Sequence, residues 1–220
     1  MTKSTDQNHF HDQPLWAIDA LSADRLSNYL VQENGDLTRA VLRYKENLSW
    51  SADLYQWLAL AEVVLRNALI SSLTPKNASI EGFDPFIHVW QDLRPEERAD
   101  YEKAVQRVLN KRRETTPGRI IGELSFSFWR FLLASDYEHS LWVRNFRHAF
   151  VALEKKDRQV VYTSVQKVNT LRNRVAHHER LIDTRLIGEV EAVIDLIRWI
   201  SPEALIWAEV HLPKIRPKAQ

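Results

Sequence analysis

The sequence predicts an all-α fold, and three observations support this prediction. Apolar residues recur with the 3.6-residue period of helices over several long segments. Residues that cap helices precede these segments, and Gly or Pro follows several of them. The 220 residues include only 5 Gly and 8 Pro, which is few for the many tight turns of a β-rich fold. We therefore expect a single-domain, multi-helix bundle.

Three cap residues mark helices in the first third of the chain. Ser22 precedes one helix, and Asp36 precedes the next. Ser49 caps a third helix, which ends before Pro75. Apolar residues occupy most of the circumference of this third helix, so we expect it to be central and largely buried. Its main stripe consists of Trp57, Leu60, Ala61, Val64, Leu65, Ala68 and Leu69.

The middle of the chain is less regular. Pro and Gly interrupt residues 74–92, where we expect a long loop with one short helix. A helix over residues 95–113 then begins with acidic residues and ends with basic ones, which matches the helix dipole. The basic cluster at its end is typical of a solvated helix terminus, with an RNA-backbone patch as the alternative. This cluster consists of Lys111, Arg112 and Arg113.

An aromatic segment follows, and we interpret it as packing because only Arg130 interleaves its rings. Its aromatic residues are Phe126, Phe128, Trp129 and Phe131.

Three more helices are expected in the last third, over residues 140–153, over 160–178 and after a cap at Asp183. The last of these is amphipathic. Its stripe consists of Leu186, Ile187, Val190, Val193, Ile194, Ile197 and Ile200. We expect residues 1–14 to be a disordered polar leader and 213–220 to be a flexible tail, which leaves 15–212 as the folded domain.

The composition limits the classes of function. A formal net charge of +1 gives no global field that attracts nucleic acid or an anionic membrane, so any RNA contact must be local. The absence of Cys excludes disulfides, thiolate chemistry and Cys-based zinc sites. No apolar segment has the length of a signal peptide core or a membrane span. We expect a soluble, cytoplasmic protein without a cofactor.

The helix over residues 160–178 contains the most informative cluster. Asn173 and His177 lie four residues apart on one exposed face, and Arg172 lies between this face and the apolar stripe. On an ideal helix Arg172 and His177 are about 140° apart, so they converge only through the long Arg side chain or a distorted final turn. The apolar stripe consists of Val161, Val165, Val168, Leu171 and Val175.

These residue types fit the cleavage of RNA without a metal. The reaction needs a base for the 2′-hydroxyl, a fixed cation for the charge on the phosphorane and a proton for the leaving 5′-oxygen. A His can serve as acid or base near neutral pH. An Arg is always charged and grips phosphate oxygens in a fork. Asn173 can orient the imidazole of His177 or bind a phosphate oxygen.

Neighbouring residues are supporting candidates, and each has a structural alternative. His178 and Glu179 would add a second proton carrier and an orienting carboxylate. Arg174 and Arg180, together with Arg172, would form a small basic cleft that binds RNA. Alternatively, Arg172 pairs with a carboxylate, and the two adjacent His are simply cations at a helix C-terminus.

Glu62 and Arg66 are charged residues in an otherwise apolar helix. Spaced four residues apart, they can pair with each other, and this structural interpretation is favoured. The functional alternative is that one of them reaches the cluster and holds His177 or Asn173 in place.

The sequence from Leu171 to Glu179, Leu-Arg-Asn-Arg-Val-Ala-His-His-Glu, closely resembles the signature of the Abi-like (abortive infection) proteins, a branch of the HEPN superfamily. Other segments resemble blocks of this family in the same order, so the resemblance covers nearly the whole chain. These segments are residues 26–30, 40–47, 62–67, 122–129 and 199–201.

The resemblance implies an α-helical protein that is commonly dimeric and, in many members, a metal-independent endoribonuclease. Arg172, Asn173 and His177 match the family motif position by position. Two copies of the motif usually face each other across the dimer, which implies a composite site. Abi-like members are associated with phage defence, where RNA cleavage by a toxin halts growth, so an antitoxin or a phage-derived trigger is an implied partner.

Two other classes of function remain as alternatives. A metal hydrolase is disfavoured because His177 and His178 project about 100° apart and the other His are scattered. His9 and His11 in the leader can chelate a metal adventitiously. The stronger alternative is a non-catalytic helical dimer that binds RNA or a protein partner.

Overall fold

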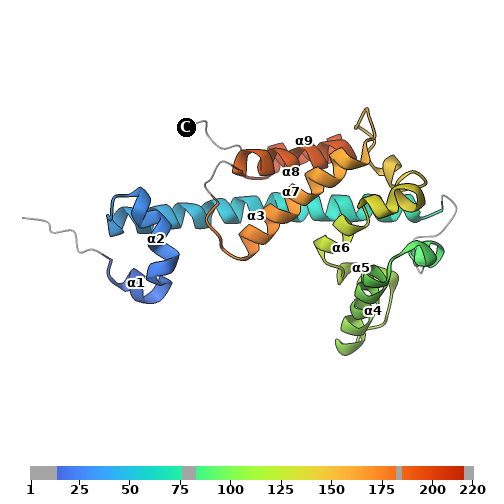
Figure 1. The fold of residues 1–220 in the computed structure, drawn as a ribbon, viewed down its shortest axis with the longest axis horizontal. Coiled ribbons are helices and arrows are strands. Elements are labelled where there is room, and N and C mark those ends of the chain that lie inside the picture. The colour runs from blue at the N-terminus through green and yellow to red at the C-terminus, as the bar shows by residue number, and fades with distance from the viewer. Residues whose placement is uncertain (1–13, 76–82, 182–184, 216–220) are drawn as a thin grey trace, which may run out of the picture. The chain divides into compact units, whose positions relative to one another are not determined.

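The computed structural model describes residues 14–75, 83–181 and 185–215, and these residues contain helices and no strand (Figure 1). The all-α prediction is therefore confirmed. The chain divides into two compact units, Met1–Ser51 and Ala52–Gln220, where the sequence predicted a single domain. No helix within the described ranges has a long enough apolar stretch to cross a bilayer.

In the first unit, α1 (Trp16–Leu21) and α2 (Ala23–Gln32) precede the start of α3. Two expected caps are confirmed, because the Arg25 N–H donates to Ser22 Oγ and the Arg39 N–H donates to Asp36 Oδ1. This unit has its own small apolar core, built from Ala17, Leu26 and Leu37 with Leu21, Leu30, Val41 and Tyr44 around them.

The helix α3 (Leu37–Leu73) is continuous over 37 residues, so the prediction that Ser49 begins a new helix was wrong. No Gly or Pro interrupts this stretch, and the Ser51 hydroxyl donates to the Asn47 carbonyl inside the helix at 2.8 Å. One face of α3 is buried, whereas Tyr55 and Val63 are 65% and 41% exposed. The helix is therefore buried along a stripe, not all round.

The middle of the second unit is held together by aromatic contacts. Its elements are η1 (Ile87–Asp92), α4 (Pro95–Asn110), α5 (Pro117–Gly122) and α6 (Phe126–Phe131). Phe86 lies 5.4 Å from Tyr101, 5.6 Å from Phe128 and 6.1 Å from Trp129 between ring centroids. Phe126, Phe128 and Trp129 are almost fully buried, which confirms the packing role for these three residues, whereas Phe131 is exposed.

The α-helix expected over residues 140–153 is absent, and shorter turns replace it. They are η2 (Ser135–Tyr137), the π-helical η3 (Glu138–Trp142) and η4 (Phe146–Ala149). The Val143 N–H donates to the Glu138 carbonyl, five residues back. The buried side chains here do not keep one α-helical period, since two of them are adjacent. They are Tyr137, Leu141, Trp142, Phe146 and Phe150.

The last part of the chain is a packed set of α7 (Arg158–Ala176), α8 (Leu186–Ile200) and α9 (Pro202–His211). In Figure 1, α8 and α9 lie side by side and α7 packs against α8. The stripe of α7 is buried as predicted, and that of α8 is buried except for Ile187. The expected cap Asp183 lies outside the described residues. The sequence did not predict α9, whose N-cap Ser201 accepts from the Ala204 N–H.

The expected flexible tail was wrong for its first residues. Trp57 Nε1 on α3 donates to the Pro213 carbonyl at 2.8 Å, and Ile215 is only 2% exposed. Residues 213–215 are therefore packed parts of the second unit.

Candidate functional site

The candidate site is the C-terminal end of α7, which a defined cap fixes in place. The His178 N–H donates to the Val175 carbonyl at 3.1 Å, and the Glu179 N–H donates to the Arg174 carbonyl at 2.9 Å. These two bonds form a Schellman motif, in which His178 takes the left-handed position with φ of 55°. The chain therefore leaves α7 in one defined direction immediately after His177.

The three motif residues differ in exposure. Arg172 and His177 are exposed, and Asn173 is half-buried. Within residues 14–75, 83–181 and 185–215, no side-chain hydrogen bond or ion pair engages any of the three. The alternative that Arg172 pairs with a carboxylate of its own chain is therefore not observed among the described residues.

The last turn of α7 is regular. The His177 N–H donates to the Asn173 carbonyl at 2.9 Å, which is the normal helical bond. The helical spacing of side chains therefore continues to His177, and Arg172 keeps its angular separation from it. The structure provides no distorted final turn that would bring the two together within one chain.

Arg174 is a structural residue, which corrects the prediction that it lines a basic RNA cleft. It is 3% exposed, and its guanidinium donates to the carboxylate of Glu189 on α8. It also donates to the carbonyl oxygens of Arg180 at 2.9 Å and Leu181 at 3.2 Å. Arg174 therefore anchors the segment after α7 to α8. Its positive charge is compensated inside the protein by the carboxylate of Glu189 and does not face solvent.

The supporting candidates next to the motif have mixed positions. Glu179 Oε2 lies 3.9 Å from Arg174 Nε, so its carboxylate forms a second ion pair with this buried cation. His178 is exposed and holds the left-handed position of the cap. Arg180 is half-buried, and its backbone carbonyl is bound by Arg174. The expected cleft of three Arg is thus reduced to Arg172 and the half-buried Arg180.

Glu62 and Arg66 on α3 do not form the expected pair. Both are half-buried, and Arg66 Nε donates to Asn67 Oδ1 at 3.3 Å. In the part of the chain that the structure describes, no side-chain hydrogen bond or ion pair links them to each other or to the motif residues. Neither their mutual pairing nor a role in holding His177 is supported.

Two polar residues that support α7 were missed by sequence reasoning. Glu189 is the carboxylate partner of Arg174, and it lies in the apolar stripe of α8 between Leu186 and Val190. An acid within an apolar stripe was the signal that could have identified a buried ion pair. Asn169 is 8% exposed and accepts from the Ser127 hydroxyl of α6 at 3.3 Å.

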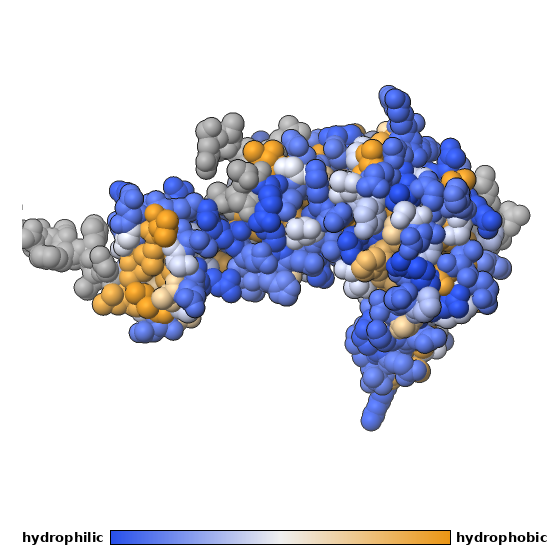
Figure 2. Space-filling model, viewed as in Figure 1, coloured by the Kyte–Doolittle hydropathy of each residue, from blue (hydrophilic) through white to orange (hydrophobic). Residues whose placement is uncertain are grey.

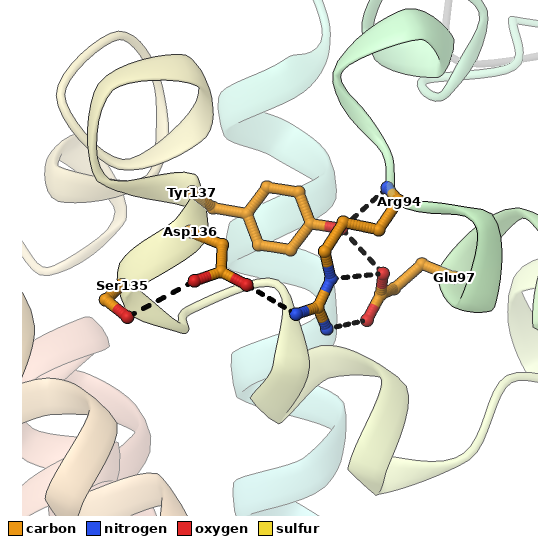
Figure 3. A network of polar contacts seen from close by, with 5 residues as sticks. All are labelled: Arg94, Glu97, Ser135, Asp136 and Tyr137. Atoms are coloured by element: carbon orange, nitrogen blue, oxygen red, sulfur yellow. Dashed lines mark hydrogen bonds and ion pairs between the residues drawn. The ribbon is translucent and has the colours of Figure 1, made fainter.

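A second polar cluster connects the start of α4 to η2 (Figure 3). Arg94 donates through Nε and Nη2 to the two carboxylate oxygens of Glu97, at 3.1 and 2.7 Å, and through Nη1 to Asp136 at 2.5 Å. The Tyr137 hydroxyl donates to Glu97 at 2.7 Å and accepts from the Arg94 N–H. Its dense internal bonding indicates a structural clamp.

The pKa values in this clamp follow from its contacts. Burial acts to raise the pKa of Glu97, but hydrogen bonds from Arg94 and Tyr137 outweigh it and leave this pKa below its ordinary value. Burial and the Glu97 carboxylate raise the pKa of Tyr137 to about 12.

Comparisons with family models, with curated proteins and with solved structures find no match to this chain. Within the described ranges, no three His, Asp or Glu side chains gather closely enough to hold a metal ion.

Proposed function

We propose that this chain is a metal-independent endoribonuclease of the HEPN type, similar to the Abi-like proteins. One observation carries the proposal: Arg172 and His177 are exposed at the capped end of α7, and no side-chain interaction within the described residues occupies them. A substrate phosphate can reach both groups from solvent.

The two side chains divide the chemistry. His177 exchanges a proton with the 2′-hydroxyl or with the leaving 5′-oxygen, as general base or acid. Arg172 binds the phosphate oxygens and stabilises the charge of the phosphorane. Asn173, half-buried one turn before His177, orients the substrate or the imidazole. The 2′-oxygen attacks phosphorus, the 5′-oxygen leaves with a proton, and the product is a 2′,3′-cyclic phosphate.

A dimer completes the site in this proposal. The regular last turn of α7 holds Arg172 and His177 on different sides of the helix. If two copies of α7 face each other, Arg172 of one chain can act with His177 of the other. The angular separation of the two residues on one helix then no longer prevents them from acting on the same phosphate. In a cell the expected role is abortive infection, in which RNA cleavage stops growth.

Cleavage of total cellular RNA by the purified protein in EDTA tests this function. We expect the wild type to cut and Arg172→Ala and His177→Ala to lose cleavage while keeping their thermal stability. Gln166→Ala is the matched control, because Gln166 is another exposed residue on α7. Cleavage that survives in His177→Ala would sink the assignment. RNA binding by folded wild type without cleavage would favour a non-catalytic RNA-binding dimer.

A further inference from the structure

The C-terminal end of α4 concentrates positive charge. Residues 107–123 contain five Lys or Arg and two Glu, a formal charge of +3 within a chain whose net charge is +1. We call these five basic residues the α4 tip: Arg107, Lys111, Arg112, Arg113 and Arg119. The remaining 203 residues together carry a slight negative charge, so the tip is a local positive feature.

The backbone brings these cations together. The Arg112 N–H donates to the Leu109 carbonyl at 2.8 Å and the Arg113 N–H to the Val108 carbonyl at 3.3 Å, which makes a Schellman motif at the end of α4. Arg112 holds its left-handed position with φ of 52°. The chain then turns back to α5, which contacts α4 and contributes Arg119.

One carboxylate organises half of the α4 tip. Glu123 lies 2.5 Å from Lys111 Nζ and 3.7 Å from Arg107 Nε, and its backbone carbonyl accepts from Arg107 Nη2 at 2.8 Å. The hydrogen bond from Lys111, with charge effects of Arg107 and Arg113, lowers the pKa of Glu123 against the effect of burial. Glu123 is therefore a shared anion between several cations.

Arg119 pairs with Glu114 at 3.7 Å, but two adjacent cations of the α4 tip have no carboxylate within ion-pair distance among the described residues. Neither Arg112 nor Arg113 forms an ion pair within residues 14–75, 83–181 or 185–215, and both are exposed. Cations held this close repel one another, so a polyanion that enters their field gains affinity from each of them.

We infer that the α4 tip binds the phosphodiester backbone of single-stranded RNA. This inference rests on the proposed function, because it assigns a docking surface to the RNA that the motif would cut. The motif end of α7 offers few cations, since Arg174 is buried in its bond to Glu189. An RNA chain carries a charge at every nucleotide, and binding strength grows with the number of neutralised phosphates.

The surface chemistry favours RNA over an anionic membrane. Helices that lie on membranes combine a basic face with a broad apolar face. The end of α4 is predominantly hydrophilic in Figure 2, and its cations surround a turn between two helices. A flexible anionic strand fits such a surface better than a flat bilayer.

Fluorescence anisotropy with a labelled uridine homopolymer, in EDTA and on a His177→Ala background, measures binding without cleavage. The test variant is Arg112→Gly with Arg113→Gln, because Gly suits the left-handed position and the fold is expected to survive. We expect affinity to fall at least about tenfold at low salt. The slope of log K against log salt should become shallower by about 1.4, because each lost phosphate contact removes about 0.7.

Two further variants make the test specific. Arg39→Gln with Lys45→Gln removes the same charge from exposed positions of α3 in the first unit and should leave affinity nearly unchanged. Glu123→Gln removes the anion shared by Arg107 and Lys111 and should tighten binding several-fold. A gain of affinity in Glu123→Gln is not the result expected from unfolding. A melting curve of each variant also checks that the fold is retained.

The outcomes separate this inference from the proposed function. RNA binding that the tip variant leaves unchanged overturns the inference, even if the wild type cleaves RNA. Binding that depends on the α4 tip upholds the inference, even if the wild type does not cleave and the nuclease proposal fails. Failure of the parent protein to bind RNA, or binding to phosphatidylserine vesicles in place of RNA, also overturns it.

Discussion

Arg174 on α7 is bonded through its guanidinium to the carboxylate of Glu189 on α8, and both side chains are almost fully buried, at 4% and 6% exposure. The same guanidinium binds the carbonyl oxygens of Arg180 and Leu181. One buried cation thus connects the helix that carries the motif, the segment that follows it and the neighbouring helix. Removing its anion leaves an uncompensated charge in the core.

We therefore expect Glu189→Leu to destabilise the protein by about 3–5 kcal/mol, the usual cost of breaking a buried pair from one side. Urea unfolding followed by circular dichroism measures this free energy. The control is Asp195→Ala, which breaks the half-exposed pair between Asp195 and Arg198 on the same helix and should cost at most about 1 kcal/mol. Equal losses of unfolding free energy in the two variants would contradict the prediction that the buried pair contributes more to stability than the half-exposed one.

His178 is predicted to be a stability-limiting residue of the α7 cap and not a catalytic group. Its φ of 55° is strained for a side chain with a Cβ, and Gly is the preferred residue at this position. His178→Gly should stabilise the protein by about 1 kcal/mol in urea unfolding, because a residue with a Cβ loses roughly this much in the left-handed conformation, and it should retain RNA cleavage. His177→Gly is the matched control: its φ is −93°, so it should lose stability as well as cleavage. Loss of cleavage in His178→Gly would make His178 a proton carrier.

The clamp around Glu97 predicts a pH-dependent part of the stability. The pKa of Glu97 lies below its ordinary value of 4.5 in the folded protein. Its contribution is therefore present above the unfolded pKa and is lost as the pH falls through the folded pKa. At pH 7, Glu97→Gln should be at least about 1.5 kcal/mol less stable than wild type, because hydrogen bonds to a charged group are lost.

Urea unfolding at several pH values checks this prediction. The difference in unfolding free energy between wild type and Glu97→Gln should shrink as the pH is lowered below about 4.5. Protonation then makes the Glu97 side chain neutral, as the Gln side chain already is. Glu46→Gln is the control, since Glu46 forms an exposed pair with Arg43. A constant difference across the pH range would refute the assigned role of the Glu97 charge.

The contact of Trp57 with the backbone after α9 predicts that Ile215 belongs to the core. Ile215 is 2% exposed, so Ile215→Ala should cost about 2–4 kcal/mol, from lost burial and the cavity left behind. Ile187→Ala on α8 is the control, because Ile187 is 53% exposed and should cost less than about 1 kcal/mol. Similar unfolding curves for the two variants would show that residues 213–215 do not stabilise the second unit.

Much of the fold follows from periodicity, and the errors have physical causes. The stripe of α7 was predictable because its Val and Leu residues keep the helical period and are all buried. Ser49 was mistaken for a cap because Ser favours caps locally, but no Gly or Pro breaks α3 there. The helix α9 was missed because its apolar residues form no single stripe: Leu205 is buried, whereas Ile206 and Trp207 are exposed.

The candidate site was predictable only in part. The exposure of Arg172 and His177 follows from their angle to the stripe of α7. The burial of Arg174 does not, because its partner Glu189 comes from another helix and pairing between helices is set by tertiary packing. Local spacing also predicted a Glu62–Arg66 pair. The described part of the chain does not contain it, since both are half-buried and Arg66 bonds Asn67.

A composite site makes a quantitative prediction about mixed dimers. Suppose that Arg172 of one chain serves His177 of the other. In a heterodimer of Arg172→Ala and His177→Ala chains, one of the two sites then has both groups intact, and the other has neither. After subunit exchange, half of the dimers are mixed, so we expect recovery of about a quarter of wild-type cleavage from two inactive variants.

The control is a mixture of the wild type with the double variant Arg172→Ala/His177→Ala. Its heterodimers contain no intact site if the groups act across the interface, and one intact site if they act within a chain. Cleavage of a labelled RNA by each mixture, against the unmixed proteins, distinguishes the two. Recovery in the first mixture, together with a fall of the second to about half the activity of its unmixed wild type, supports the composite site. No recovery in the first mixture and unchanged activity in the second would mean that Arg172 and His177 converge within one chain, in spite of the regular last turn of α7.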